Sequence, residues 1–299
     1  MSISAQAPTT GSPQSREFWT ATVFIVPALL AFSIFVVFPM AQAGWYSFFN
    51  WDGYGTPTDF IGFGNFIEAF RTPAFKVALI NICWTVAASV FVQIPLGLAM
   101  ALLLANKLHG AVYFRLIFFL PYVLAEVATG LIFSFVYDGD YGLLKPIFAL
   151  FGQDAPYPLA EPDTAIYAIL FVVVWKYFGF HMMLIIAGLQ SIDKSLLEAA
   201  TIDGASRWQI TRYLVVPLLA PILKLCIFFA VLGAVQFFDL IMPLTGGGPL
   251  DSTQTLVTYL YTNGITRMRI GYGSAVGVVL FLICVVFAFT YKKWILRDE

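Results

Sequence analysis

The sequence predicts an all-α, polytopic membrane protein with six transmembrane helices. Of its 299 residues, 60% are apolar and only 11% are charged. Soluble domains carry about 25% charged residues and about 45–50% apolar residues, so a soluble core cannot absorb this much apolar surface. The apolar residues also gather in six segments of the length that a bilayer requires, which is about 20 residues per helix.

The six expected spans are distributed along nearly the whole chain. Residues 1–17, before the first span, are rich in Ser, Thr, Pro and Gln, and we expect a disordered cytoplasmic tail. Residues 18–299 then form one transmembrane domain. The first span is not expected to be a signal peptide, because its leader has a single base, Arg16, and its apolar run is too long. The spans cover residues 19–40, 77–104, 116–136, 165–189, 218–244 and 272–291.

Composition also limits the possible partners and metals. A formal net charge of -1 argues against a nucleic-acid partner. Cys83, Cys226 and Cys284 each fall inside an apolar run, which favours a packing role. Their odd number and their spacing indicate neither a disulfide framework nor a metal site.

The distribution of Lys and Arg predicts the orientation in the membrane. Six spans put both termini on one side, and loops rich in Lys and Arg stay in the cytoplasm. We therefore predict cytoplasmic termini. The side of the termini would hold nine bases, Arg16, Lys107, Arg115, Lys194, Arg207, Arg212, Lys292, Lys293 and Arg297. The opposite side would hold four, Arg71, Lys145, Arg267 and Arg269.

The most polar long run between two spans is "SLLEAATIDGASRWQ", residues 195–209. Ser195 and Glu198 fit a capping box at the start of a short helix. Gly204 suits the left-handed position that ends a helix. Ser206 and Gln209 fit a second capping box, so the loop is predicted to be a short helix, a sharp turn and a second helix leading to the next span.

A helix of about seven residues is marginal on its own, because nucleation outweighs the few bonds gained. The helix at 196–202 must therefore lean on another surface. One possibility is the membrane or its own bundle, with Glu198 acting only as a cap. The other is a cytoplasmic partner, which Ala199 and Ala200 would allow to approach closely.

The stretch "EAATIDGASRWQITRYLVVPLLAP" resembles the EAA loop of binding-protein-dependent ABC importer permeases. It has Glu-Ala-Ala, a Gly four residues after the last Ala, and Pro217 and Pro221 downstream, with Thr211 where the family often has an aromatic residue. The stretches "FIGFGNF", "PLGLAMALLLANKLHGAVYFRLIFFLPY", "AGLQSID" and "LTGGGP" resemble the carbohydrate (maltose-type) branch. Together with the ending "YKKWILRDE", "LTGGGP" is more similar to its first, F-type permease. The similarity covers residues 24–294.

This resemblance implies a type I permease bundle in a bacterial-type inner membrane. The chain would form half of a pore with a second homologous permease, two ATP-binding subunits and an extracytoplasmic sugar-binding protein. The loop at residues 190–217 would be the coupling loop, and the helix at 196–202 would sit in a groove of an ATP-binding subunit, where Glu198 meets a basic residue. The implied coupling residues are Leu196, Glu198, Ala199, Ala200, Asp203 and Gly204.

The chain is not expected to be an enzyme or to bind a cofactor. It has no G-x-x-x-x-G-K-[ST] motif, and "LTGGGP" lacks the Lys that a phosphate loop needs, so ATP and Mg²⁺ are expected on the partner subunits. "LTGGGP" either faces a binding protein or contains its glycines only because the loop turns there. His109 and His181 lie far apart in the sequence, and no Ser-His-Asp, paired-carboxylate or Cys-His arrangement emerges.

Ionisable residues within the spans are costly, by about 2.5–3.5 kcal/mol on insertion scales, and usually face a bundle interior or a pathway. Lys224 is near the cytoplasmic end and can reach the interface. For Glu126, Lys176 and Asp239, one interpretation is a charge pair between Lys176 and a carboxylate. The other is a polar cavity, completed by Trp84, Tyr177, His181 and Gln236.

The segments "WKYFGFH" and "QFFD" supply the planar polar groups and aromatic faces that bind sugars, and the resemblance places cavity residues in matching regions. Rival functions remain open at this point. An ion-coupled secondary transporter would use Glu126, Lys176 and Asp239 as a relay, and a membrane scaffold or receptor would use the loop helix as a docking peptide. An amino-acid or ion importer is a further alternative. Gly273 and Gly277 form a G-x-x-x-G pair for close packing, either inside the bundle or against a second permease.

Overall fold

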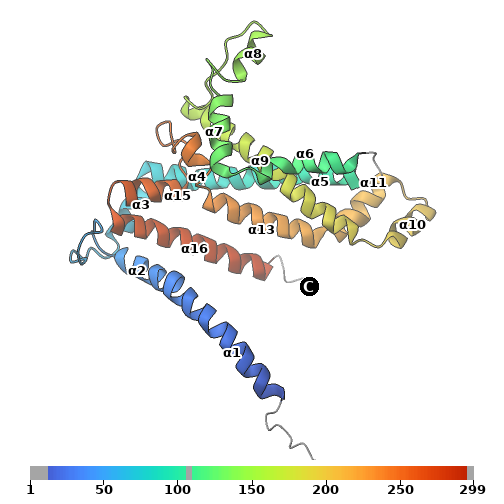
Figure 1. Cartoon of the computed structure of the whole chain (residues 1–299). Coiled ribbons are helices and arrows are strands. Elements are labelled where there is room, and N and C mark those ends of the chain that lie inside the picture. The colour runs from blue at the N-terminus through green and yellow to red at the C-terminus, as the bar shows by residue number, and fades with distance from the viewer. Residues whose placement is uncertain (1–12, 106–109, 295–299) are drawn as a thin grey trace, which may run out of the picture.

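The computed structural model describes residues 13–105 and 110–294, and helices joined by loops make up most of this part (Figure 1). Within these residues there is no β-strand, and Phe49 and Phe60 form an isolated antiparallel bridge. The expected fold class, an all-α polytopic membrane protein, is confirmed. Lys107, His109 and Arg297 lie outside the described residues.

Residues 13–37 of the first span stand away from the bundle, whereas residues 38–46 lie against the last helix (Figure 1). The span runs through α1 (Pro13–Phe32), the π-helical turn η1 (Ser33–Val37) and α2 (Phe38–Tyr46). Helix α1 therefore begins inside the segment 1–17 for which we expected disorder; residues 1–12 are outside the described part. None of the residues in the most apolar window of this span is buried, so lipid or another protein must cover it.

Three further spans are long and apolar enough to cross a membrane as single helices. The second expected span forms α4 (Pro73–Ala88), the π turn η2 (Ser89–Gln93) and α5 (Ile94–Ala105), and the sixth is α16 (Ile270–Trp294). The fourth is α9 (Pro162–Gln190), and 61% of its most apolar window is buried. Helix α9 is therefore the central element of the bundle.

The third and fifth expected spans are broken rather than continuous. The third consists of α6 (Ala111–Val123) and α7 (Glu126–Val136), which meet at 96°. The fifth is divided at 64° between the helical segment Arg207–Leu218 and α13 (Ala220–Gln236). Six spans result if each bent pair is counted as one.

The expected boundaries of the fifth span are corrected by the structure. Helix α13 ends at Gln236, and α14 (Ile241–Leu244) is a separate short helix. Asp239 lies in the turn between them and not inside a membrane helix. The helical segment before α13 comprises α11 (Arg207–Ile210), the π turn η3 (Thr211–Val215) and α12 (Val216–Leu218).

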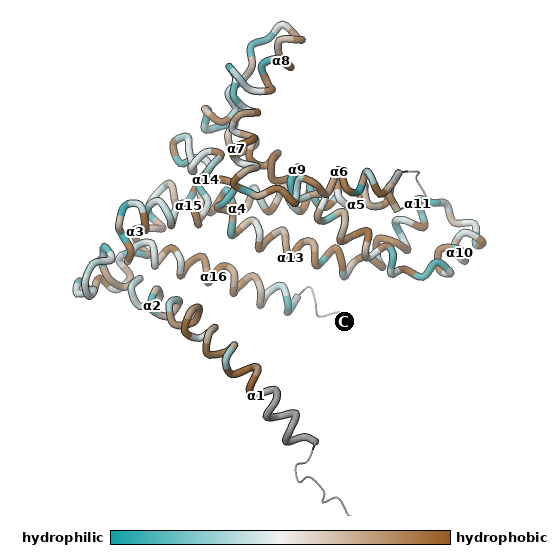
Figure 2. Tube along the Cα trace, viewed as in Figure 1, coloured by the Kyte–Doolittle hydropathy of each residue, from teal (hydrophilic) through white to brown (hydrophobic). Residues whose placement is uncertain are grey.

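Short helices close the ends of the bundle. Helix α10 (Lys194–Ile202) lies at one end, and α3 (Gly64–Arg71) lies at the other with α15 (Leu256–Leu260) and the π turn η4 (Tyr261–Thr266) nearby (Figure 1). Helix α8 (Leu144–Ala149) sits on an arm that projects from the bundle. Hydrophilic residues gather near α3 and near α10, and hydrophobic residues dominate the helices between them (Figure 2). This polarity matches a slab of lipid around the middle of the bundle.

Buried residues form three clusters, and α9 contributes to two of them. Met182 of α9 packs with residues of α5 and α13, and Ile169 of α9 packs with residues of α7 and α14. Phe75 of α4 belongs to the third cluster, shared with α13, α15 and α16. Helices α6 and α9 cross so closely that a Cβ built at Gly179 would lie 1.9 Å from the carbonyl oxygen of Phe118.

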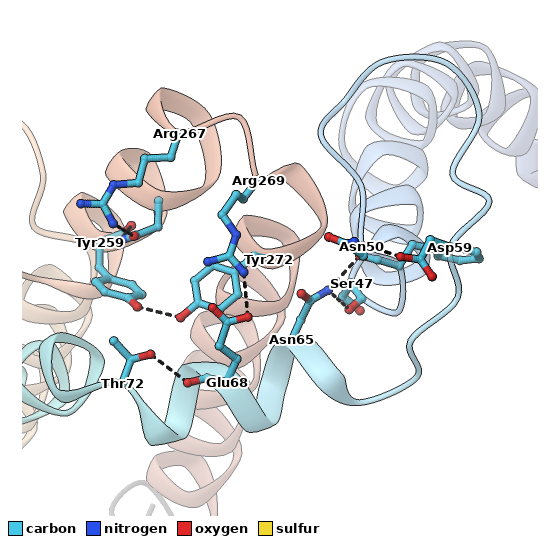
Figure 3. Close-up of polar contacts among 12 residues, drawn as sticks. Ser47, Asn50, Asp59, Asn65, Glu68, Thr72, Tyr259, Arg267, Arg269 and Tyr272 are labelled. Atoms are coloured by element: carbon cyan, nitrogen blue, oxygen red, sulfur yellow. Dashed lines mark hydrogen bonds and ion pairs between the residues drawn. The ribbon is translucent and has the colours of Figure 1, made fainter.

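Polar contacts fasten the end of the bundle near α3 (Figure 3). Asn65 of α3 donates to two backbone carbonyls that follow α2, at 2.9 Å each. Glu68 of α3 forms a 2.7 Å ion pair with Arg269, just before α16. The hydroxyl groups of Tyr259 and Tyr272 lie 2.6 Å apart. The ion pair of Glu68 with Arg269 joins segments 201 residues apart in the sequence.

The G-x-x-x-G pair packs inside the chain. A Cβ built at Gly273 would lie 2.6 Å from the Cα atom of Gly264 in η4, and one at Gly277 would lie 3.4 Å from a side-chain carbon of Leu260. Helix α16 therefore approaches η4 at backbone distance. Of the two interpretations left open, the structure supports the contact within the bundle.

Candidate functional site

A cavity of about 420 Å³ opens between the central helices, where both broken spans meet α9. Polar and aromatic side chains share its wall. Its lining comprises Gln93, Tyr122, Glu126, Tyr177, Phe180, His181, Phe229, Ala230, Gly233, Ala234, Gln236, Phe237 and Asp239. Five of the seven residues predicted for a substrate pathway therefore lie together, namely Glu126, Tyr177, His181, Gln236 and Asp239.

The break between α6 and α7 places Glu126 at this cavity. The expected span 116–136 would place Glu126 in the middle of a continuous helix, but Glu126 is the first residue of α7. The hydroxyl of Tyr177, from α9, donates a hydrogen bond to its carboxylate. The carboxylate is thus fixed by a neighbouring helix, and its remaining oxygen lone pairs can accept hydrogen bonds from a ligand.

His181 and the aromatic rings form another part of the wall. The His181 side chain is 2% exposed, and its Nδ1 atom has no hydrogen-bond partner. Buried polar atoms are normally paired, so an unpaired one beside a cavity indicates a ligand or water partner. The ring of Tyr122 stacks on Phe180 with centroids 4.7 Å apart. Flat apolar faces beside polar groups suit a polyhydroxyl ligand, which presents both kinds of surface.

Gln93 and Tyr122 are cavity residues that the sequence analysis missed. Gln93 ends the π turn η2 and is buried, and the hydroxyl of Ser89 lies 3.4 Å from its Oε1 atom. π-Helical turns inside α-helices occur often at functional sites. An amide in an apolar run, two residues before Pro95, was the available signal.

Lys176 does not line the cavity, contrary to one of our two interpretations. Its ammonium group is 2.5 Å from the carbonyl oxygen of Leu124, 3.3 Å from that of Pro121 and 3.5 Å from the Thr129 hydroxyl. The alternative charge pair is not formed either, since the only ion pair among the described side chains, residues 22–105 and 110–293, is that of Glu68 with Arg269. Lys176 instead satisfies the carbonyls at the end of α6 and holds the break open.

Trp84 is also outside the cavity. Its side chain is 47% exposed, and its ring packs edge-to-face against Tyr167 with centroids 6.2 Å apart. Helix α4 buries its polar residues Asn81 and Thr85 and leaves Trp84 exposed, so the ring lies outside the buried face of this helix. Trp84 therefore does not line this cavity.

The polar loop forms the expected short helix, turn and second helix, with one correction at its start. Helix α10 begins at Lys194, and the side chain of Asp193 accepts the backbone N–H of Ser195 at 2.9 Å. Asp193 is therefore the N-cap, in place of the predicted box of Ser195 and Glu198. Hydrogen bonds from the backbone and side chain of Ser195 lower the pKa of Asp193.

The turn after α10 has the predicted geometry. Gly204 has a φ of +82°, and its N–H donates to the carbonyl of Thr201, while the N–H of Ala205 donates to that of Ala200. These are the two bonds of a Schellman motif. The capping box of Ser206 and Gln209 at α11 is confirmed.

Helix α10 rests on its own bundle by one side and is open on the other. Leu197 packs against the cluster that contains Met182. Leu196, Glu198, Ala199, Asp203 and Gly204 are exposed, and Ala200 is half-buried. Ile202 and Trp208, which we did not predict as site residues, are 86% and 70% exposed. The helix therefore leans on its own bundle through Leu197, and it leaves an apolar, partly acidic surface uncovered.

The "LTGGGP" segment forms a compact loop. Gly246 and Gly247 have φ values of +60° and +91°, and a Cβ at Gly247 would lie 2.5 Å from the side chain of Gln254. Asn81 of α4 donates to the carbonyls of Ser252 and Gln254 at 2.8 and 2.9 Å, which fixes the loop to the bundle. The turn itself therefore requires these glycines.

A helical membrane bundle with a polar, aromatic-walled cavity and an exposed, rigid helix at one end defines a membrane transport protein. Residues 93–295 match the family described as binding-protein-dependent transport system inner membrane component. The chain belongs to this family of transport permeases, multi-pass proteins of the inner membrane.

Similar proteins cover nearly the whole chain. A probable ABC transporter permease protein of Pyrococcus horikoshii is 32% identical over 280 residues, which are 93% of this chain and 96% of the relative. The multiple sugar-binding transport system permease protein of Streptococcus mutans is 34% identical, with 90% and 92% covered. The sulfoquinovosyl glycerol transport system permease protein of Agrobacterium fabrum is 32% identical, with 91% and 89% covered.

The fold also occurs in a solved structure. A chain in the crystal structure of a bacterial ABC transporter involved in the import of the acidic polysaccharide alginate matches with a TM-score of 0.82. The match covers 94% of this chain and 96% of that one, at 22% identity. Likeness at this identity shows the fold alone.

Proposed function

We propose that this chain is the permease subunit of an ATP-driven importer for a sugar or sugar derivative. It forms half of a translocation pore with a second permease, and two ATP-binding subunits supply the hydrolysis of ATP with Mg²⁺. An extracytoplasmic binding protein delivers the substrate. Membership of the permease family supports this assembly, and the names of several relatives support a sugar-type substrate.

The proposal rests on how α10 is attached to the bundle. The helix is capped at both ends, is fixed to the bundle through Leu197, and leaves the side with Leu196 and Ile202 uncovered. Such a helix transmits the movement of a bound partner to the bundle as a rigid lever. The exposed Glu198 carboxylate would pair with a base of the ATP-binding subunit.

Two substitutions in the loop test this coupling. Glu198→Lys reverses the charge at the docking surface, and Gly204→Val forces a β-branched residue into the left-handed conformation. We expect both variants to insert normally and to lose uptake in proteoliposomes that contain the whole complex. Asp154→Lys, a charge reversal at an exposed position outside the loop, should keep uptake.

Normal uptake and normal substrate-stimulated ATPase activity in both loop variants would contradict the docking role. Uptake that survives ATP depletion and stops with an uncoupler would indicate the ion-coupled alternative instead.

The cavity between the two broken spans is the proposed substrate site. His181 and Gln236 offer hydrogen-bonding groups, and Tyr122 and Phe180 offer ring faces. We expect His181→Ala and Gln236→Ala to lower apparent affinity or rate by about tenfold, the effect of one or two lost hydrogen bonds. Uptake measured against substrate concentration checks this, and unchanged values in both variants would remove the cavity from the pathway.

A further inference from the structure

The cavity wall carries more negative than positive charge, and this restricts the ligands that the cavity can bind. Glu126 and Asp239 both line it, and its lining contains no Lys or Arg. The other polar members of the wall are uncharged amides and phenols, apart from the His181 imidazole, and imidazole is mainly neutral at neutral pH. The wall is therefore acidic.

The nearest base does not cancel this charge. The ammonium group of Lys176 is 5.7 Å from the ring of Tyr177, so it lies close to the wall. It is already engaged by the carbonyls of Pro121 and Leu124. Even when Lys176 is included, two carboxylates outnumber one ammonium, and only the carboxylates face the ligand space.

The carboxylates are arranged to accept hydrogen bonds. Tyr177 fixes Glu126 from one side, and Asp239 is exposed in the turn between α13 and α14. Carboxylates accept bonds from hydroxyl or ammonium donors and repel other anions, and low-dielectric walls strengthen both effects. The unpaired Nδ1 atom of His181 adds a group that still needs a partner.

We propose that this cavity admits neutral or positively charged polyhydroxyl ligands, such as neutral sugars or amino sugars, and rejects anionic ones. Uronic acids, sugar sulfonates and sugar phosphates would place a second negative charge beside Glu126 and Asp239. This inference rests on the proposed function, because it assigns a charge class to the substrate of the same cavity.

Charged thiol reagents measure the sign of the potential without any transport. Gly233 lines the cavity, and a Cβ at this position would have no atom within 4 Å, so Gly233→Cys is tolerated sterically. The assembled complex is treated with a cationic trimethylammonium-ethyl and an anionic sulfonatoethyl methanethiosulfonate. The labelling rate of the introduced cysteine with each reagent is divided by the rate of the same reagent with a small free thiol in the same buffer.

We expect the corrected rate to favour the cationic reagent by about tenfold or more, the range of electrostatic focusing in a charged cleft. Adding Glu126→Gln and Asp239→Asn should bring the ratio close to that of Tyr54→Cys, an exposed position in the loop after α2. The unsubstituted complex reports any reaction at Cys83, Cys226 and Cys284. A ratio near one at Gly233→Cys, or a ratio that favours the anion, would overturn the proposal.

A second experiment identifies the charge of the natural ligand. The cognate binding protein is screened by thermal shift against neutral sugars, amino sugars, uronic acids and glycerol 3-phosphate, and each hit is tested for ATP-dependent uptake. Uptake confined to neutral or amino sugars supports the proposal. ATP-dependent uptake of an anionic hit would overturn the charge selection but leave the importer function intact, whereas ATP-independent uptake of every hit would overturn the importer function.

Discussion

Lys176 is 1% exposed, and its ammonium group lies against the last carbonyls of α6. Leu124 and Ala125 have extended backbones, with ψ values of 139° and 140°, so the helix ends here. The N–H of Leu124 still donates to the carbonyl of Pro121 at 3.3 Å, and Lys176 donates to the carbonyl of Leu124. In a membrane, each unsatisfied backbone group costs several kcal/mol, and irregular backbone persists only where protein or water pairs with it. Lys176 therefore supplies the hydrogen bond that the broken helix lacks, and Glu126 reaches the cavity because the break exists.

Lys176→Met should destabilise the protein, since it leaves the carbonyl of Leu124 unpaired at a cost of about 1–3 kcal/mol, while the carbonyl of Pro121 keeps the N–H of Leu124 at 3.3 Å. We expect a Tm lower by about 5 °C or more in detergent, measured by intrinsic fluorescence. Lys224→Met is the matched control, because Lys224 is half-buried near one end of α13. If the two variants melt at the same temperature, Lys176 does not hold the break.

At the scale of residues, the sequence analysis found the chemistry of the cavity but not the direction of each side chain. "WKYFGFH" and "QFFD" supplied six of the lining residues, namely Tyr177, Phe180, His181, Gln236, Phe237 and Asp239. Trp84 lies outside the cavity, and Gln93 was missed. Polar residues recur every four positions at Asn81, Thr85, Ser89 and Gln93 and are all buried, but this spacing does not say which of them meets the cavity and which meets another helix. Only neighbouring helices determine which side faces the cavity.

At the scale of elements, α10 shows how a nine-residue helix is made rigid. Asp193 caps its first turn, the Schellman motif closes its last, and Leu197 anchors it. Isolated helices of this length are unstable, so both caps and the anchor are needed.

Asp193→Ala removes the N-cap acceptor and should lower ATP-driven uptake, whereas Asp193→Asn keeps an acceptor oxygen and should resemble the parent. The hydrogen-bonded carboxylate has a pKa below its ordinary value. The stabilisation of α10 by this ionised carboxylate is therefore complete above the unfolded pKa of about 3.9, and it is lost as the pH falls through the lower pKa of the folded state. Uptake should consequently show no step from this group near neutral pH. Equal uptake by the Ala and Asn variants would contradict a capping role.

Local signals predicted the loop elements well and the broken spans poorly. Gly204, Ser206 and Gln209 act on their immediate neighbours, so their spacing was sufficient. Pro121 and Pro217 marked weak points in the third and fifth spans, but prolines are tolerated in membrane helices. At the 96° break between α6 and α7, the backbone carbonyls contact Lys176, which lies more than 50 residues away in the sequence. No local pattern contains that contact.

At the scale of the whole molecule, the bundle has two distinct polar ends. The loop after α2 and the contacts of Glu68 with Arg269 lie at the end near α3, and α10 lies at the opposite end (Figures 1 and 3). The excess of Lys and Arg predicts that the end with α10 and the end of α16 face the cytoplasm. Because α16 packs tightly on η4, each end of α16 stays at one end of the bundle and can report which side of the membrane that end faces.

Labelling of single cysteines with a membrane-impermeant maleimide tests this orientation. Tyr54→Cys, in the exposed loop after α2, should react in intact cells. Lys293→Cys, exposed near the end of α16, should react only after the membrane is permeabilised. The unsubstituted protein controls for Cys83, Cys226 and Cys284. The reverse pattern would invert the protein and place α10 outside the cell, where no ATP-binding subunit could reach it, so this labelling result bears directly on the coupling mechanism.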